Sequence, residues 1–138
     1  MKNVILSVLF YTLIASCSSK ENYIKDVYVN CEIDINLPQY SDLNIAGNSI
    51  FINNHGNKGL IIYHFSTNEY RVYDRNCSYQ PRLTCARIDS INSTIGYCGC
   101  CDSAFLLDQN GEAINSPAIL PLKQYNWALN GSILHIVN

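Results

Sequence analysis

The cysteines of this chain are concentrated in one short window. Five of the seven lie between positions 77 and 101, and the run Cys98-Gly99-Cys100-Cys101-Asp102-Ser103 follows Cys77. Cysteine clustered this densely is typical of disulfides, a metal site or thiol chemistry. We therefore predict a fold in which two neighbouring hairpin tips bring their sulfur atoms together.

The first residues predict export. Lys2 precedes an apolar run at positions 4–14, which is shorter than the roughly 20 residues of a membrane-spanning helix. Ile14-Ala15-Ser16-Cys17 resembles a bacterial lipobox, in which the cysteine is acylated after cleavage. The expected organisation is a signal peptide at 1–16, a lipidated tether at 17–25 and a domain at 26–138. The alternative is a soluble secreted protein in which a cysteine lies near the signal-peptide cleavage site by chance.

Composition narrows the class of partner. Removing residues 1–16 leaves eight Lys and Arg against eleven Asp and Glu, a balance of −3. A mildly acidic chain without a basic run argues against nucleic acid as a partner. The expected location is the cell envelope, periplasmic or surface-exposed, where the lipid would hold the protein to the inner or outer membrane and disulfides are permitted.

Alternating apolar residues predict an all-β domain. Period two runs from Asp26 to Leu37 and includes Cys31, which this pattern places in the core. Residues 39–47 lack periodicity and are expected to form a connection. Further short strands are expected at 48–53, 60–65, 70–73, 85–91, 94–97, 104–107, 124–129 and 132–137. Asn130-Gly131 between two alternating runs is a strong hairpin signal. These features predict a β-sandwich or small barrel.

The cysteine loops, together with the segment from Ser116 to Tyr125, resemble the Rieske-like fold. That family holds a [2Fe–2S] centre between a C-x-H loop and a C-x-x-H-G-S-x-F loop. Here Cys77-Ser78-Tyr79 stands at the first loop, and the residues from Cys98 to Phe105 stand at the second. Ser116-Pro117-Ala118, Leu122 and Tyr125 match the segment beside the cluster. The resemblance implies an all-β sandwich or small barrel with two cysteine-bearing loops at hairpin tips.

The ligand residues depart from the family pattern. Tyr79 stands at the first lost histidine position, and Cys101 stands at the second. The resemblance also implies a Cys85–Cys100 disulfide between the loops, as in Rieske proteins that carry an extra cysteine in each loop. Cys77, Cys98 and Cys101 then remain at three ligand positions, where they could hold zinc or an altered [2Fe–2S] cluster. The alternative is that no cofactor is bound and the sulfurs pair as disulfides.

This interpretation of the cysteine loops allows two functions. The first is a redox or metal-binding module that transfers one electron to a membrane partner if iron is bound. The second is a binding or structural envelope module that has lost the cluster. Cys98-Gly99-Cys100-Cys101 contains C-x-x-C, but no helix is expected after it, which argues against thiol-exchange catalysis. We therefore expect an electron carrier or binding module, with no catalytic residues, rather than an enzyme.

Overall fold

The described part of the chain, residues 23–138 of a computed structural model, folds into two antiparallel sheets. The signal peptide, Cys17 and residues 18–22 of the expected tether lie outside these residues. The first sheet contains β1 (Asn30–Asp34), β10 (Ile133–Val137), β9 (Gln124–Asn130), β4 (Glu69–Asp74), β3 (Leu60–Ser66) and β2 (Ser49–Ile52), in that order. The second contains β5 (Ile88–Asn92), β6 (Ile95–Cys98), β7 (Ala104–Leu106) and β8 (Glu112–Asn115).

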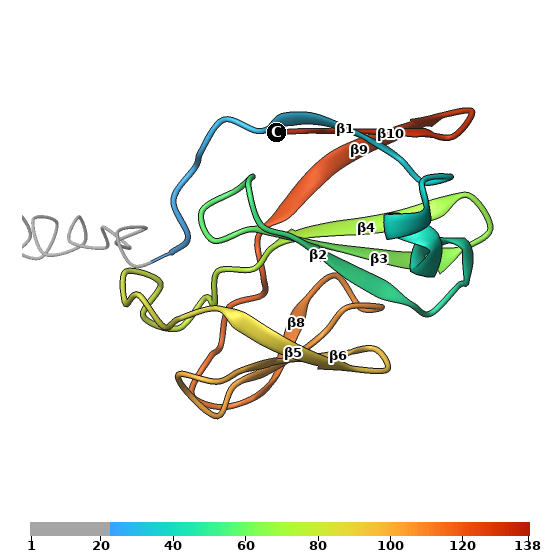
Figure 1. Ribbon diagram of the computed structural model, residues 1–138. Helices are drawn as coiled ribbons and strands as arrows, with labels where there is room; N and C mark the ends of the chain where they lie inside the picture. The colour runs from blue at the N-terminus through green and yellow to red at the C-terminus, as the bar shows by residue number, and fades with distance from the viewer. Residues whose placement is uncertain (1–22) are drawn as a thin grey trace, which may run out of the picture.

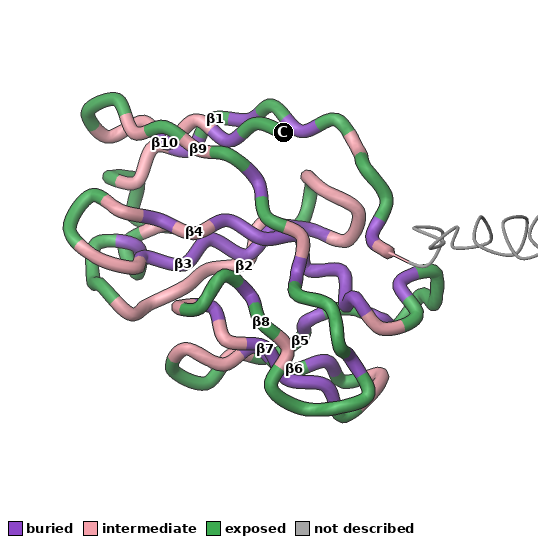
Figure 2. The backbone as a smooth tube through the Cα atoms, turned by 180° about the vertical axis from the view of Figure 1, so that it is seen from behind, coloured by how far each residue is buried: buried purple, intermediate pink, exposed green. Residues whose placement is uncertain are grey.

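The first sheet curls, so the domain has two hydrophobic cores. In Figure 1, β1, β9 and β10 lie on one side of β2, β3 and β4, and the second sheet lies on the other. β3 is buried on both faces: Leu60 and Ile62 pack into the first core, while Ile61 and Tyr63 pack into the second. This explains the continuous apolar run of β3, and Figure 2 shows β3 and β4 as mostly buried. The all-β prediction is confirmed.

Some element boundaries differ from those expected. The alternation from 26 to 37 predicted one long strand, but β1 covers only Asn30–Asp34 because it pairs with the five residues of β10. Val29 stays buried beyond that ladder. The connection expected at 39–47 contains a 3-10 helix, η3 (Pro38–Asn44), which begins with proline and buries Leu43. β8 was not anticipated and forms the edge of the second sheet. Residues 23–138 contain no helix with the length and apolar character needed to cross a membrane.

Two buried tyrosine hydroxyls connect distant segments of the domain. Tyr73 donates a hydrogen bond of 2.6 Å to the Leu107 carbonyl oxygen, which joins β4 to the segment after β7. Tyr125 on β9 donates one of 2.7 Å to Asp74 Oδ2. Burial raises the pKa of Tyr73 to about 12. Burial and the hydrogen bond to Asp74 raise the pKa of Tyr125 above its ordinary value of 10.0. Both hydroxyls are therefore kept protonated by the fold.

These pKa shifts predict alkaline instability. Between pH 10 and 12 the unfolded chain releases tyrosine protons that Tyr73 and Tyr125 retain when folded, so the free energy of unfolding falls as pH rises. The expected fall is about 1.4 kcal/mol per pH unit for each such tyrosine. Urea unfolding from pH 8 to 11.5 measures it, with Tyr73→Phe as the comparison. The variant should lose stability less steeply above pH 10, and identical slopes would contradict the assignment to Tyr73.

Candidate metal centre

Two loops form the candidate site. The first runs from Cys77 to Ala86 and connects β4 in the first sheet with β5 in the second. An isolated antiparallel bridge between Asn76 and Arg87 closes its base, and the Cys77 N–H donates to the Ala86 carbonyl oxygen over 3.0 Å. The second loop joins β6 to β7, where the Cys98 N–H donates to the Ser103 carbonyl oxygen over 3.0 Å. Both loops therefore start and end on paired backbone, which fixes their cysteines.

The structure joins the two loops through sulfur. Cys85 of the first loop and Cys100 of the second form a disulfide, with their Cα atoms 5.3 Å apart. A disulfide stabilises a fold chiefly by restricting the unfolded chain. Here it also ties the loop that connects the two sheets to the β6–β7 loop of the second sheet. The relative position of the remaining thiols is held by this bond as well as by the sheets.

Three free thiols converge beside this disulfide. The sulfur atoms of Cys77, Cys98 and Cys101 all lie within 4.8 Å of one another, and those of Cys77 and Cys101 are 3.7 Å apart. Cys77 and Cys98 are buried, and Cys101 is partly exposed. Cys31, the fourth free cysteine of the described residues, packs in the first core and does not join the group. The structure thus brings together the three cysteines proposed as ligands.

The three thiols differ in acidity. Burial raises the pKa of Cys77 and of Cys98 above the ordinary 9.0, although backbone N–H groups of Tyr79 and Cys100 oppose this effect. Burial acts in the same direction on Cys101. The hydrogen bonds of Cys101 with Ser103 and with the other two thiols outweigh burial, so its pKa falls below 9.0. Cys101 is therefore the thiol most easily converted to the thiolate that a metal requires.

Ser103 connects Cys101 to the segment that contains Ala118. Its buried hydroxyl lies 3.2 Å from the Cys101 sulfur and accepts a 2.9 Å hydrogen bond from the Ala118 N–H. With the oxygen already accepting from Ala118, the hydroxyl proton is available to a Cys101 thiolate. The family motif placed Ser103 next to the ligands, but nothing in the sequence predicted this contact.

A lysine from another hairpin supports the first loop. Lys58 lies in the turn between β2 and β3, and its ammonium donates to the carbonyl oxygens of Pro81, Leu83 and Ala86. Burial lowers the pKa of Lys58, while the nearby Cys77 and Cys98 thiols act in the opposite direction. Sequence reasoning missed Lys58, because it reaches carbonyl groups 23 to 28 residues away and no local pattern marks it.

The site fits a single thiophilic ion better than the family's usual cluster. A [2Fe–2S] centre of this fold takes two cysteines and two histidines on two irons. No described histidine belongs to the group: His64 stacks on Tyr70, and His135 pairs with Glu32. Tetrahedral zinc bonds of about 2.3 Å place sulfur ligands roughly 3.8 Å apart. The 3.7 Å between Cys77 and Cys101 matches that spacing.

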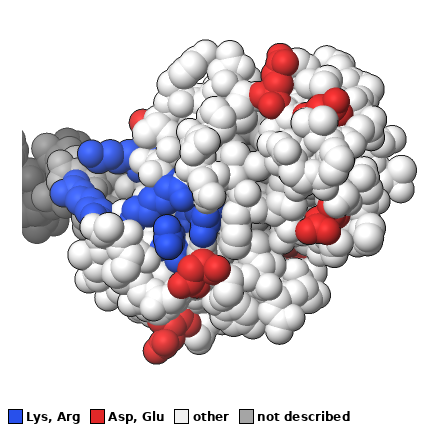
Figure 3. Space-filling view, in the orientation of Figure 1, with Lys and Arg blue, Asp and Glu red and all other residues white. Residues whose placement is uncertain are grey.

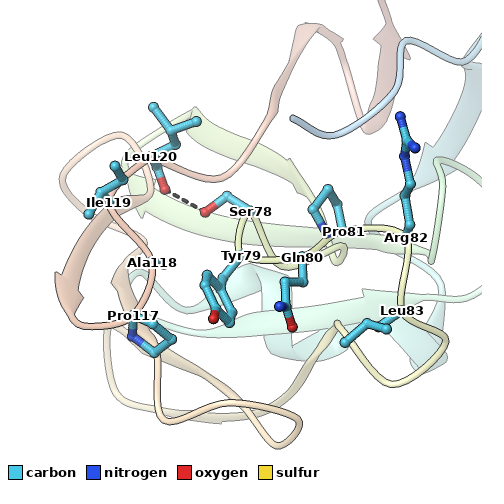
Figure 4. Close-up of a pocket in the computed structure, with 10 residues that line it drawn as sticks. All are labelled: Ser78, Tyr79, Gln80, Pro81, Arg82, Leu83, Pro117, Ala118, Ile119 and Leu120. Carbon is cyan, nitrogen blue, oxygen red and sulfur yellow. Dashed lines mark hydrogen bonds between the residues drawn. The ribbon is translucent and has the colours of Figure 1, made fainter. Parts of the chain in front are cut away.

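An open groove borders the first loop. It has a volume of about 530 Å³ and lies between residues 78–83 and the tail segment 117–120. Figure 4 shows Tyr79 facing Pro117 across it, and Ser78 donating to the Leu120 carbonyl oxygen over 2.5 Å. Tyr79, which the loop resemblance places at the first lost histidine position, lines this groove.

No family model matches the chain, and no curated protein matches it. Solved structures give weak likenesses. The ferredoxin of Sphingomonas yanoikuyae B1 is 19% identical over 68% of this chain and 88% of that chain, with a TM-score of 0.48. The ferredoxin of carbazole 1,9a-dioxygenase from Nocardioides aromaticivorans IC177 is 11% identical over 67% and 86%, with a TM-score of 0.47.

A third similar structure is a putative NADH-dependent nitrite reductase small subunit from Mycobacterium tuberculosis. It is 10% identical over 82% of this chain and 97% of that chain, with a TM-score of 0.44. Two of these three structures are thus ferredoxins, and the third is a putative nitrite reductase small subunit.

Proposed function

We propose that this domain binds one thiophilic metal ion, zinc or iron, through Cys77, Cys98 and Cys101. The observation that carries the proposal is the convergence of three thiol sulfurs within 4.8 Å of one another. Thiolates are strong ligands for both zinc and iron. Among the residues described, three protein ligands are available, so the fourth position is left to water or an outside ligand.

The chemistry of the module depends on the ion. Zinc would make the centre structural, holding the loop between the two sheets against the β6–β7 loop. Iron would support one-electron transfer to a redox partner protein. In either case the residues of this chain have defined tasks. Cys77 and Cys98 supply buried ligands, Cys101 supplies the most acidic thiol, and Ser103 orients it.

We propose further that the domain is held at the cell envelope. The lipobox-like residues up to Cys17 support export and acylation, after which lipid chains would anchor the domain. The Cys85–Cys100 disulfide agrees with an oxidising compartment. Acylation is tested separately, by the mass of the mature chain made through its native export route.

A metal-free module is the second candidate. The 3.7 Å between the Cys77 and Cys101 sulfurs favours it, because neighbouring thiols in an oxidising compartment can join as a disulfide. The protein would then be a binding or structural envelope component that keeps the fold without the metal.

Metal analysis and thiol counting separate the two candidates. We expect about one equivalent of zinc or iron in protein exported by its native route. Under denaturing conditions with a chelator and no reductant, the four free cysteines of residues 23–138 should all react. Metal-free protein with only two reactive thiols would reject the metal site and support the second candidate.

A further inference from the structure

One end of the domain combines basic and apolar surface. Beside the groove already described lies a second hollow of about 330 Å³, lined by Lys25, Lys58, Asn76 and Arg82 among others. Pro81 and Arg82 line both hollows, so the two share one wall. Figure 3 shows Lys and Arg gathered at this end of the molecule. Residues 23–138 carry ten acidic and seven basic residues, so this gathering runs against the overall charge.

The groove contributes exposed aliphatic side chains to the same end. Ile119 is 89% exposed, and Leu83 and Leu120 are each nearly half exposed. Figure 4 places these three side chains around the groove. Basic residues beside exposed aliphatic side chains are the composition of proteins that lie against an anionic membrane surface.

Asn76, which lines the basic hollow, has a buried side-chain oxygen without a hydrogen-bond partner among residues 23–138. Asn76 is 4% exposed, and within the described residues its Oδ1 accepts no hydrogen bond. A phospholipid headgroup would supply both kinds of partner at this place. Its phosphate suits the cationic side chains of Lys25 and Arg82, and its hydroxyl or ammonium group could donate to Asn76.

The position of Tyr23 connects this surface to the proposed anchor. Tyr23 lines the basic hollow and donates to the Pro121 carbonyl oxygen over 3.0 Å. Only residues 18–22 separate it from Cys17. Even fully extended, that distance is at most about 20 Å. An acyl chain on Cys17 would therefore hold this end of the domain close to the bilayer.

We infer that the end formed by the groove and the basic hollow lies against a membrane surface and contacts anionic phospholipid. This inference rests on the proposed lipid anchoring at Cys17. It implies that the loops carrying Cys77 and Cys101 face the bilayer, so a redox partner of this site would itself be a membrane protein. A soluble acidic protein docking on the same end is the competing occupant.

Fluorescence quenching tests this orientation in the full chain made by its export route. Trp127 is replaced by Phe, and one tryptophan is introduced as Ile119→Trp. The matched control is Ile45→Trp, because Ile45 is 61% exposed and follows η3, at the far end of the molecule in Figure 1. The proteins are reconstituted in vesicles of brominated phosphatidylcholine with or without phosphatidylglycerol.

We expect bromine to quench Ile119→Trp by roughly half in the anionic vesicles, since side chains of surface-bound domains reach the headgroup boundary. Ile45→Trp should be unaffected. Adding Lys25→Gln and Arg82→Gln to Ile119→Trp should reduce quenching to the level found without phosphatidylglycerol. Equal quenching of Ile119→Trp and Ile45→Trp would overturn the inference. If bromine did not quench Ile119→Trp at all, the inference would also fail, and a protein partner on this end would be favoured instead. The acyl mass on Cys17 is measured in the same samples, so a failure of anchoring is distinguished from a failure of orientation.

Discussion

Cys101→Ser should weaken metal binding by at least about 100-fold, because loss of even an outer-shell partner commonly costs 10- to 100-fold. Cys101 is one of three sulfurs that converge within 4.8 Å, and its thiol is the one with a lowered pKa. Serine retains the shape of the side chain but is a far poorer ligand for a thiophilic ion. Zinc titration against a chromophoric chelator measures the affinity. Cys101 is partly exposed, so we expect the variant to fold.

Cys31→Ala is the matched control for the thiol variants. It removes a buried free thiol from the first core, whereas Cys77 and Cys98 belong to the second. We expect this variant to lose stability and to bind zinc with unchanged affinity. Cys98→Ser should behave like Cys101→Ser. If Cys101→Ser and Cys98→Ser bound zinc as tightly as the unmodified protein, the three-thiol site would be refuted.

The strands were largely predictable because their signals are local. Leu60-Ile61-Ile62-Tyr63 is continuously apolar since β3 is buried on both faces, and Asn130-Gly131 separates two alternating runs that pair as β9 and β10. η3 and β8 were not predicted. A seven-residue 3-10 helix has too few turns to show a period, and Glu-Ala-Ile-Asn at a sheet edge carries no clear alternation.

The site was only partly predictable. The loop motifs identified Cys77, Cys98 and Cys101 as candidate ligands. Their spacing alone could not show that the Cys77 sulfur lies next to sulfurs 21 and 24 residues further along the chain. That they bind a metal stays a prediction. Lys58 and Asp74 had no local sequence signal, because their partners lie up to 51 residues away along the chain. Tyr125 reaches Asp74 because β9 pairs with β4 in the first sheet, and Lys58 reaches the first cysteine loop from the turn between β2 and β3.

Asp74→Ala should destabilise the domain by about 3–5 kcal/mol, a large part of the 5–15 kcal/mol typical of a folded domain. The Asp74 side chain is fully buried at the end of β4. Its two oxygens accept hydrogen bonds from the backbone N–H groups of Asn57, Lys58 and Asn76, from the Asn57 side-chain amide and from the Tyr125 hydroxyl. Alanine would leave these donors buried without an acceptor. Urea unfolding at pH 7 measures the loss.

Asp42→Ala provides the control, because this carboxylate lies on the exposed surface of η3 and should change stability by less than about 0.5 kcal/mol. Asp74→Ala carries a second consequence. Lys58 and Asn76 adjoin the base of the first cysteine loop, so loss of their acceptor should loosen that loop and weaken zinc binding even in folded protein. A variant as stable as Asp42→Ala would show that the five donors find other acceptors. It would also remove Asp74 as the link between the folding of β4 and the position of the thiols.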